Sequence, residues 1–298
     1  MIKRQKYKLK KHKLGFYQIC PLPKQQELEQ YYRDKYFQKP TVSTYSRTYS
    51  RSELLYNKIA CEVTDFIALK LGLKGQKTVL DVGCGEGFFL KGLKDLKWKV
   101  LGTDLSCEGV KTQNFSIINK IRFGPAEKIL GQLRQQKVQF SLVNLGNILE
   151  HVINPILLLK DIFPLLQANG ILRVVVPNDA SGFQAMLKKE KRSQGSWIHP
   201  PDHLSYFNFR SLKKVLSSCN YTPVFELGDF PIELFLLNKH SNYENQKKTG
   251  TEAHYARVKT SLYVRSRGLE NYIKWASGLA SGDTTRSCIL FAKKKRVK

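Results

Sequence analysis

The sequence predicts an α/β fold with a doubly wound, mostly parallel sheet of seven strands and helices on both faces. Between residues 77 and 227, short runs rich in Val, Ile and Leu alternate with longer amphipathic segments. Strands and helices that alternate at these lengths imply crossover connections, and therefore parallel strands. A last apolar run at residues 287–294 (SCILFAKK) is expected to close the sheet after an inserted segment.

The individual elements follow from periodicity. Apolar residues such as Leu55, Ile59 and Val63 recur at helical spacing and predict a helix over residues 53–71 that ends near Gly72, with Ser52 as its N-cap. The expected strands cover residues 77–82, 98–103, 138–145, 170–177, 222–227 and 287–294, with a short one near 121. The expected helices between them cover residues 86–96, 107–119, 155–167 and 210–219, with a short one after 126.

Composition shifts divide the chain into four parts. We expect a basic, Tyr-rich and partly helical extension over residues 1–52 and a core over 53–227. Residues 228–284 have a weaker pattern and are expected to form an insertion that covers the substrate like a lid. The last strand and a basic tail occupy residues 285–298.

The chain is strongly basic, with 50 Lys and Arg against 24 Asp and Glu and a net charge of +26. Such an excess indicates an anionic partner, such as nucleic acid, a phosphorylated substrate or a membrane surface. The basic residues are spread along the chain, so the sequence does not locate one binding patch.

Neither a membrane span nor a metal site is expected. No apolar run approaches the ~20 residues that a spanning helix needs, and the basic N-terminus has no apolar stretch after it, so we expect a soluble, cytoplasmic protein. The six cysteines have no close pair, which fits free thiols in a reducing compartment. The acids and histidines show no ligand spacing that would indicate a metal.

Residues 79–87 (VLDVGCGEG) predict a strand that ends in a ligand-binding loop. In an open parallel sheet, ligands bind beyond the carboxyl ends of the strands, and Gly83, Gly85 and Gly87 permit close approach there. A nicotinamide or flavin site would need G-x-G-x-x-G, but the third glycine position holds Phe88. The loop therefore favours a ligand with adenosine but without pyrophosphate, and Asp81 before it can face an ammonium group of that ligand.

Asp104 stands at the end of the second strand, where a carboxylate accepts hydrogen bonds from both hydroxyls of a ribose. The alternative is that Asp104 caps the following helix, a role it would share with Ser106.

With these motifs in order, residues 53–227 and the last strand resemble the class I S-adenosylmethionine (SAM)-dependent methyltransferases, which have a Rossmann-like fold. VLDVGCGEG is similar to the first motif of that family, GTD to its ribose-binding acid, GPAEKI to its adenine segment, and NLGNILEHVINP to its fourth motif. The resemblance implies SAM as cofactor and a cofactor site formed by Asp81, Gly83, Cys84, Gly85, Gly87, Asp104, Leu105, Ala126, Glu127, Leu145 and Asn147.

Two segments resemble one subgroup of the family. LEHV at residues 149–152 and the His-containing segment at 200–216 are typical of enzymes that methylate sugars, quinone precursors and other small acceptors. Ser141 departs from the family pattern, since an Asp is common there; that Asp is mainly structural.

On the acceptor side, the candidates for catalysis are His151, His203 and Tyr206. Methyl transfer needs in-line attack by the acceptor, and a hydroxyl acceptor also needs a base, for which His is the usual choice near neutral pH. Each of these residues has a structural alternative, since histidines near helix starts often cap or pack and aromatic residues often belong to the core.

Three functions are compatible with the sequence. The first is O-methylation of a small-molecule or glycan-type acceptor, including an anionic one, supported by LEHV and the His203 loop. The second is methylation of RNA, supported by the charge. The third is a degenerate SAM-binding domain that serves in interactions; it would be favoured if both histidines lay far from the methyl group.

Overall fold

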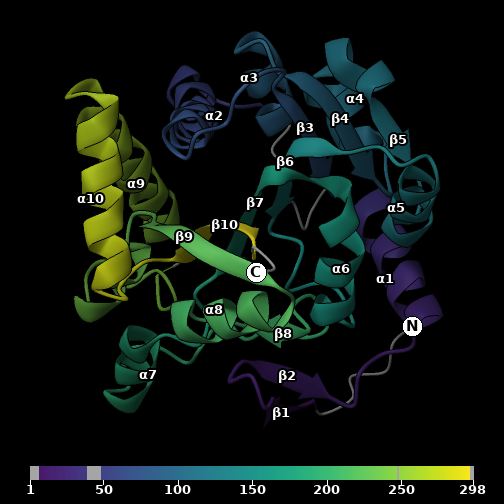
Figure 1. The fold of residues 1–298 in the computed structure, drawn as a ribbon. Helices are drawn as coiled ribbons and strands as arrows, with labels where there is room; N and C mark the ends of the chain where they lie inside the picture. The colour runs from purple at the N-terminus through teal and green to yellow at the C-terminus, as the bar shows by residue number, and fades with distance from the viewer. Residues whose placement is uncertain (1–6, 39–47, 247, 296–298) are drawn as a thin grey trace.

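The computed structural model describes residues 7–38, 48–246 and 248–295. Parts of the predicted extension (residues 1–6 and 39–47) and the end of the basic tail (296–298) lie outside the described residues. Figure 1 shows the sheet at the centre of the fold with helices around it.

The predicted sheet is confirmed. Its seven strands have the order β5-β4-β3-β6-β7-β10-β9. They are β3 (Thr78–Val82), β4 (Lys99–Asp104), β5 (Ile121–Phe123), β6 (Phe140–Gly146), β7 (Leu166–Pro177), β9 (Tyr221–Gly228) and β10 (Ser287–Lys294). Strand β10 is antiparallel to both of its neighbours, whereas β3 to β7 pair in parallel. The chain runs outward from β3 to β5 and then crosses to β6, so the winding reverses between β3 and β6.

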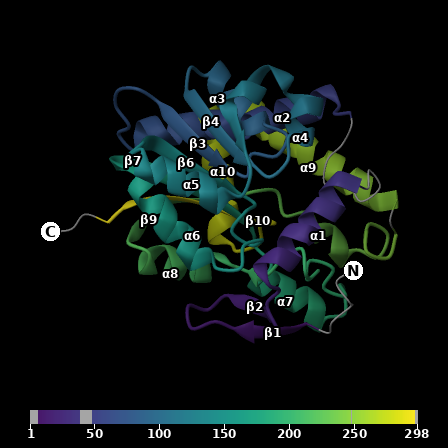
Figure 2. The same ribbon diagram turned by 90° about the vertical axis from the view of Figure 1, so that its right-hand side faces the viewer.

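Helices cover both faces of the sheet, as Figures 1 and 2 show. Side chains alternate along β3, so Leu80 and Val82 pack on one face with helices α5, α6 and α8, while Val79 packs on the other with α2, α3 and α10. The core-covering helices are α2 (Arg51–Lys70), α3 (Phe88–Asp95), α4 (Glu108–Gln113), α5 (Ala126–Gln135), α6 (Pro155–Ile162), α8 (Phe209–Ser218) and α10 (Leu269–Ser281). Short 3₁₀ turns occur at Phe115–Lys120, Phe163–Leu165 and Ile232–Leu237.

Helix α2 begins earlier than the sequence predicted. Its N-cap is Ser50, not Ser52: the Ser50 side chain accepts from the Glu53 N–H at 3.3 Å, and the Glu53 carboxylate accepts from the Ser50 N–H at 2.9 Å. This reciprocal pair is a capping box, and it extends the helix by two residues relative to the expected start at residue 53.

Ser141 performs a structural task at the start of β6. Its hydroxyl donates to the Thr78 carbonyl at 2.8 Å and accepts from the Thr78 N–H at 2.8 Å. The hydroxyl therefore joins β6 to the first residue of β3.

The N-terminal part contains a second, three-stranded sheet that the sequence did not predict. Strands β1 (Lys8–Lys11) and β2 (Tyr17–Cys20) form a hairpin, and β2 pairs with β8 (Ser205–Tyr206). The sequence offered little indication of these strands because they are very short and every residue of β1 is exposed. Helix α1 (Gln25–Gln38) follows and confirms the helix expected in the extension.

The segment between β9 and β10 is mainly helical. It holds α9 (Lys248–Ser266) and α10, which contact each other and α2. Tyr272, Ile273 and Ala276 of α10 are buried in the core cluster that includes Leu227 of β9. Much of the segment thus packs beside the sheet. None of its described residues (228–284) lines the large cavity next to the glycine loop, which is described below. A further short helix, α7 (Gly182–Lys189), follows β7.

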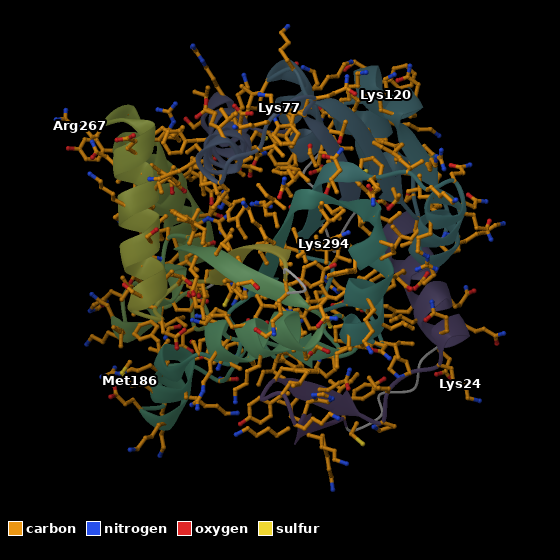
Figure 3. The ribbon with its side chains drawn as sticks, in the orientation of Figure 1. Lys24, Lys77, Lys120, Met186, Arg267 and Lys294 are labelled. Atoms are coloured by element: carbon orange, nitrogen blue, oxygen red, sulfur yellow. The ribbon has the colours of Figure 1, made fainter. Side chains whose placement is uncertain are left out.

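Basic side chains are dispersed over the molecule. Figure 3 labels Lys24, Lys77, Lys120 and Arg267 around the outline of the molecule and Lys294 near the centre of the view. Among the described residues, no helix combines the length and the apolar character that crossing a membrane requires.

Candidate functional site

A cavity of about 460 Å³ lies beyond the carboxyl ends of β3, β4 and β6, where the winding of the sheet reverses. This is the position at which open α/β sheets bind ligands. The predicted residues that line it are Gly83, Cys84, Gly85, Gly87, Asp104, Leu105, Ala126, Glu127, Asn147 and His151. The sequence motifs are thus brought together around one space.

The glycine loop has a backbone that requires glycine. Gly83, Gly85 and Gly87 have φ angles of +70°, +54° and +78°. A Cβ at Gly83 would also lie 2.1 Å from Cδ1 of Ile148. Both observations explain why side chains are excluded at these positions.

Asp104 supports this loop. Its carboxylate accepts from the Gly85 N–H at 2.7 Å and from the Ser106 N–H at 3.0 Å. The N-cap of α4 is Cys107, so the alternative role of Asp104 as that cap is wrong. Burial raises the pKa of Asp104, and the two N–H donors act in the opposite direction.

Two residues that were predicted to bind the cofactor lie behind the wall of the cavity rather than in it. Leu145 is fully buried in the core. Asp81 is 3% exposed and accepts from the Asn144 amide at 2.6 Å, while Asn144 in turn accepts from Arg173 at 2.7 Å. Burial raises the pKa of Asp81 to about 7.

The far end of the cavity was not predicted. Gln25, Leu28 and Tyr32 of α1 line it together with His151, Val152 and Ile153. The Tyr-rich composition of residues 25–37 was the only signal in the sequence that this helix has a special place.

His151 and His203 are brought together by the backbone. The Glu150 carbonyl accepts from the Leu204 N–H at 2.8 Å and from the Ser205 N–H at 3.1 Å. The His203 loop is therefore tied to the turn after β6, and the two imidazole centroids are 5.0 Å apart.

His151 reaches the cavity from this turn. Its Nδ1 lies 2.6 Å from the Asp202 carbonyl, and its Nε2 lies 3.7 Å from Oε1 of Glu150. Burial and the neighbouring His203 lower the pKa of His151 to about 4. The imidazole is therefore neutral at neutral pH.

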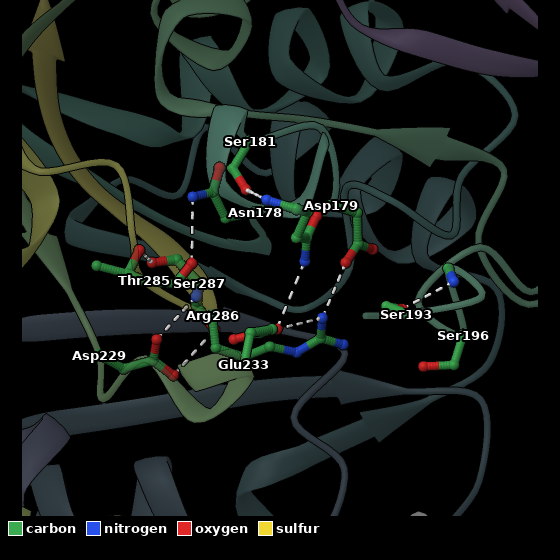
Figure 4. Close-up of polar contacts among 12 residues, drawn as sticks. Asn178, Asp179, Ser181, Ser193, Ser196, Asp229, Glu233, Thr285, Arg286 and Ser287 are labelled. Carbon is green, nitrogen blue, oxygen red and sulfur yellow. Dashed lines mark hydrogen bonds and ion pairs between the residues drawn. The ribbon is translucent and has the colours of Figure 1, made fainter. Parts of the chain in front are cut away.

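His203 is 8% exposed and is held by a chain of charged groups. Its Nδ1 is 3.1 Å from Oδ2 of Asp179, whose Oδ1 accepts from Arg286 at 3.0 Å. Arg286 also donates to Glu233 at 3.1 Å, and Figure 4 shows it between these two carboxylates. His203 itself does not line the large cavity.

Glu150 lies beside both histidines and is 1% exposed. Neither of its carboxylate oxygens has a hydrogen-bond partner among the described residues, and burial raises its pKa to about 8. Glu150, His151 and His203 each offer one ligand atom, and these atoms lie within 4.8 Å of one another. The sequence spacing gave no sign of this cluster, because it arises from tertiary contacts.

Tyr206 is 2% exposed and packs with Ile19, Leu28 and Leu204. Its hydroxyl donates to the His203 carbonyl at 3.0 Å. This position favours a role in holding the His203 loop over contact with an acceptor.

A second cavity of about 320 Å³ lies on the other side of the histidines. Trp197, Glu233, Tyr243 and Arg257 are among its lining residues, and so is His199, whose ring centroid is 4.2 Å from that of His203. The three imidazoles of His151, His203 and His199 thus form a row between the two cavities.

Comparison with known proteins agrees with this geometry. A family described as a methyltransferase domain matches residues 55–225, more than half of the chain, so the chain belongs to this family. It is a class I SAM-dependent methyltransferase, and SAM is the cofactor of the family. A search of curated proteins finds no match.

Solved structures show the same fold at low sequence identity. The plantazolicin methyltransferase BamL, in complex with a triazolic desmethylPZN analog and SAH, is similar with a TM-score of 0.54 and 13% identity over 91% of this chain and 97% of that one. The [4+2]-cyclase SpnF is similar with a TM-score of 0.52 and 16% identity over 93% of this chain and 99% of that one.

Proposed function

We propose that the large cavity binds SAM. Asp104 would accept from the ribose hydroxyls, Ala126 and Glu127 would flank the adenine, and the loop at Gly83 and Gly85 would face the methionine part. This assignment is supported by the glycine backbone, by the Asp104 carboxylate at the strand end and by the position of the cavity at the reversal of the sheet. Asp81 and Leu145 would support this wall from behind.

We further propose that the acceptor binds at the α1 end of the same cavity and is methylated on a hydroxyl group. Leu28, Tyr32, Val152 and Ile153 offer apolar and aromatic surface there, and Gln25 and His151 offer polar groups. Such a mixed lining suits a small molecule or one sugar of a glycan. The observation that carries this proposal is the position of His151, in the cavity wall and backed by Glu150 and His203.

In this reaction the acceptor oxygen attacks the methyl carbon in line with the sulfur. A C–O bond forms, the C–S bond breaks, and SAH is released. The group formed by Glu150, His151 and His203 would make the hydroxyl reactive. A pKa of about 4 makes His151 a weak base at neutral pH, so in a purely protein-based step it would mainly hold the acceptor hydroxyl by a hydrogen bond, with His203, oriented by Asp179, behind it.

The alternative of an RNA acceptor has less support. Among the described residues that line the large cavity there is no Lys or Arg, whereas a phosphate backbone is held mainly by such side chains. The position of His151 in the wall is also unlike that expected of a degenerate binding module. We keep the cytoplasm as the proposed location, which fits six cysteines that are all free thiols.

The test is to incubate cell extract with the protein and isotopically labelled SAM, and to separate small molecules, glycans, lipids and RNA before mass spectrometry. We expect label in the small-molecule or glycan fraction, and its loss with Asp104→Ala. Label confined to RNA would replace the proposed acceptor. An absence of label in every fraction, from a protein that binds SAM, would instead support a binding module.

A further inference from the structure

We propose that Glu150, His151 and His203 bind a divalent transition-metal ion, and that this ion holds the acceptor hydroxyl beside SAM. The inference rests on the proposed function for its second half, whereas ion binding itself stands on the geometry alone.

The first observation is the carboxylate of Glu150. It is 1% exposed, and neither oxygen has a hydrogen-bond partner among the described residues. A buried carboxylate without partners is costly, because it has lost its hydration and gained nothing in return. A cation bound to these oxygens removes that cost.

The second observation is the orientation of the two imidazoles. Nδ1 of His151 lies against the Asp202 carbonyl at 2.6 Å, and Nδ1 of His203 lies against Asp179 at 3.1 Å. Metal-binding histidines almost always donate their other ring N–H to a carbonyl or carboxylate, which fixes the tautomer and leaves the remaining nitrogen as the ligand. Here that arrangement leaves Nε2 of both residues for the ion.

The distances are close to those that one ion needs. Two ligands on a tetrahedral ion with bonds of about 2.1 Å are separated by roughly 3.4 Å. Nε2 of His151 is 3.7 Å from Oε1 of Glu150, and one possible ligand atom from each of the three residues lies within 4.8 Å of the other two.

The ligand set indicates the class of ion. Two imidazole nitrogens and one carboxylate oxygen suit zinc, manganese or iron, whereas magnesium and calcium prefer oxygen ligands throughout. Three protein ligands leave at least one position open, as in catalytic zinc sites. Because His151 lines the SAM cavity, an ion held by it would lie at the wall of that cavity.

The chemistry differs from that of a histidine base. An ion held by these three residues would lower the pKa of a bound acceptor hydroxyl, so that its proton could pass to solvent water. The acceptor oxygen would then attack the methyl carbon of SAM as the C–S bond breaks, which releases SAH. With their Nε2 atoms on the ion, the histidines position the acceptor rather than accept its proton.

A structural explanation without an ion is that Glu150 is protonated and donates to His151. The 3.7 Å separation is too long for that hydrogen bond. The two explanations are separated by direct measurement of ion binding.

The experiment is calorimetric titration of the untagged, chelator-treated protein with zinc chloride and, separately, with manganese chloride. We expect one ion per chain. The affinity should fall at least about 100-fold in Glu150→Gln and His203→Ala, and about 10- to 100-fold in Asp179→Asn, which keeps all three ligands but removes the partner of His203. His240→Ala and Glu252→Gln, at exposed positions, are the matched controls and should bind as the wild type does.

Circular dichroism checks that each variant is folded. If a variant that lacks a ligand does not fold, Asp179→Asn, which keeps all three ligands, still tests the proposal. The proposal is overturned if neither ion binds the wild type with saturation, or if Glu150→Gln and His203→Ala bind like the wild type. Methyl transfer that continues in excess chelator would overturn the role of the ion in the reaction. Ion binding without transfer to any acceptor would instead count against the proposed function alone.

Discussion

At the level of single residues, the site depends on three buried or half-buried carboxylates in different settings. Asp104 is held by two backbone N–H groups, Asp81 by the Asn144 amide, and Glu150 by no hydrogen bond among the described residues. The same side-chain chemistry can therefore support a loop, stabilise a buried polar chain or bind a cation.

Asp81 makes the stability of the protein depend on pH. Its pKa is about 7 in the folded protein because burial disfavours the charged form. The contribution of Asp81 to stability is therefore full below pH 4 and is lost as the pH rises through 7. Relative to Asp81→Asn, the wild type should lose up to about 4 kcal/mol of unfolding free energy between pH 4 and pH 8, because the pKa of Asp81 rises from 3.8 to about 7 and a difference of 1 in pKa corresponds to ~1.4 kcal/mol.

Thermal or urea unfolding across this pH range, without SAM, measures the difference. Asp95→Asn, an exposed carboxylate on α3, is the control. A difference between wild type and Asp81→Asn that stays constant with pH would show that Asp81 does not titrate in this range.

The sequence was informative about residues whose role is local. Gly83 and Asp104 were predicted because a loop after a strand and an acid at the next strand end are defined within a short stretch. The Glu150–His203 pair was not predicted, because it depends on hydrogen bonds from Leu204 and Ser205 to the Glu150 carbonyl across the fold.

At the level of elements, α1 and the small sheet shape the acceptor end of the cavity. Leu28 of α1 is 6% exposed and packs with Ile19 of β2 and Leu204 beside β8, while it also lines the cavity. Composition alone indicated an N-terminal extension but not where it lies in the fold, since α1 contacts residues that are far away in the sequence.

Leu28→Ala should therefore loosen α1 and weaken SAM binding. Truncation of a buried leucine costs about 2–5 kcal/mol in local packing. We expect faster proteolysis within α1 and a several-fold faster release of SAH, measured by limited proteolysis and stopped-flow fluorescence. Leu22→Ala removes the same atoms at a position that is 39% exposed and should change neither rate; equal effects of both variants would refute the role of α1.

The start of α2 gives a second test at this level. Ser50→Ala removes the observed N-cap and should lower the free energy of unfolding by about 1 kcal/mol. Ser52→Ala, at the cap position that the sequence predicted, should leave stability unchanged or slightly raise it, since Ser52 is an exposed helical residue. Urea unfolding of the two variants decides between the positions, and a larger loss for Ser52→Ala would contradict the structure.

At the level of the whole molecule, the sheet was predictable because its strands carry continuous apolar runs and alternate with helices. Strand β10 was placed at residues 287–294 by its apolar run alone, and the structure gives the same bounds. The segment before it was less predictable. The buried residues of helix α9 are Ala253, Val258 and Ser261, which do not form an apolar stripe that the sequence would reveal. The contacts of α9 with α2 become visible only in three dimensions.

The sheet reversal, the glycine loop and the Asp104 strand end together define one binding site, and SAM titration tests it most directly. Calorimetry should show one SAM per wild-type chain. Asp104→Ala should bind at least about tenfold more weakly, because hydrogen bonds to a charged group are worth about 1.5–3 kcal/mol. Asp95→Ala should bind like the wild type. A wild-type protein that does not bind SAM, or binding that Asp104→Ala leaves unchanged, would contradict the assignment of this site.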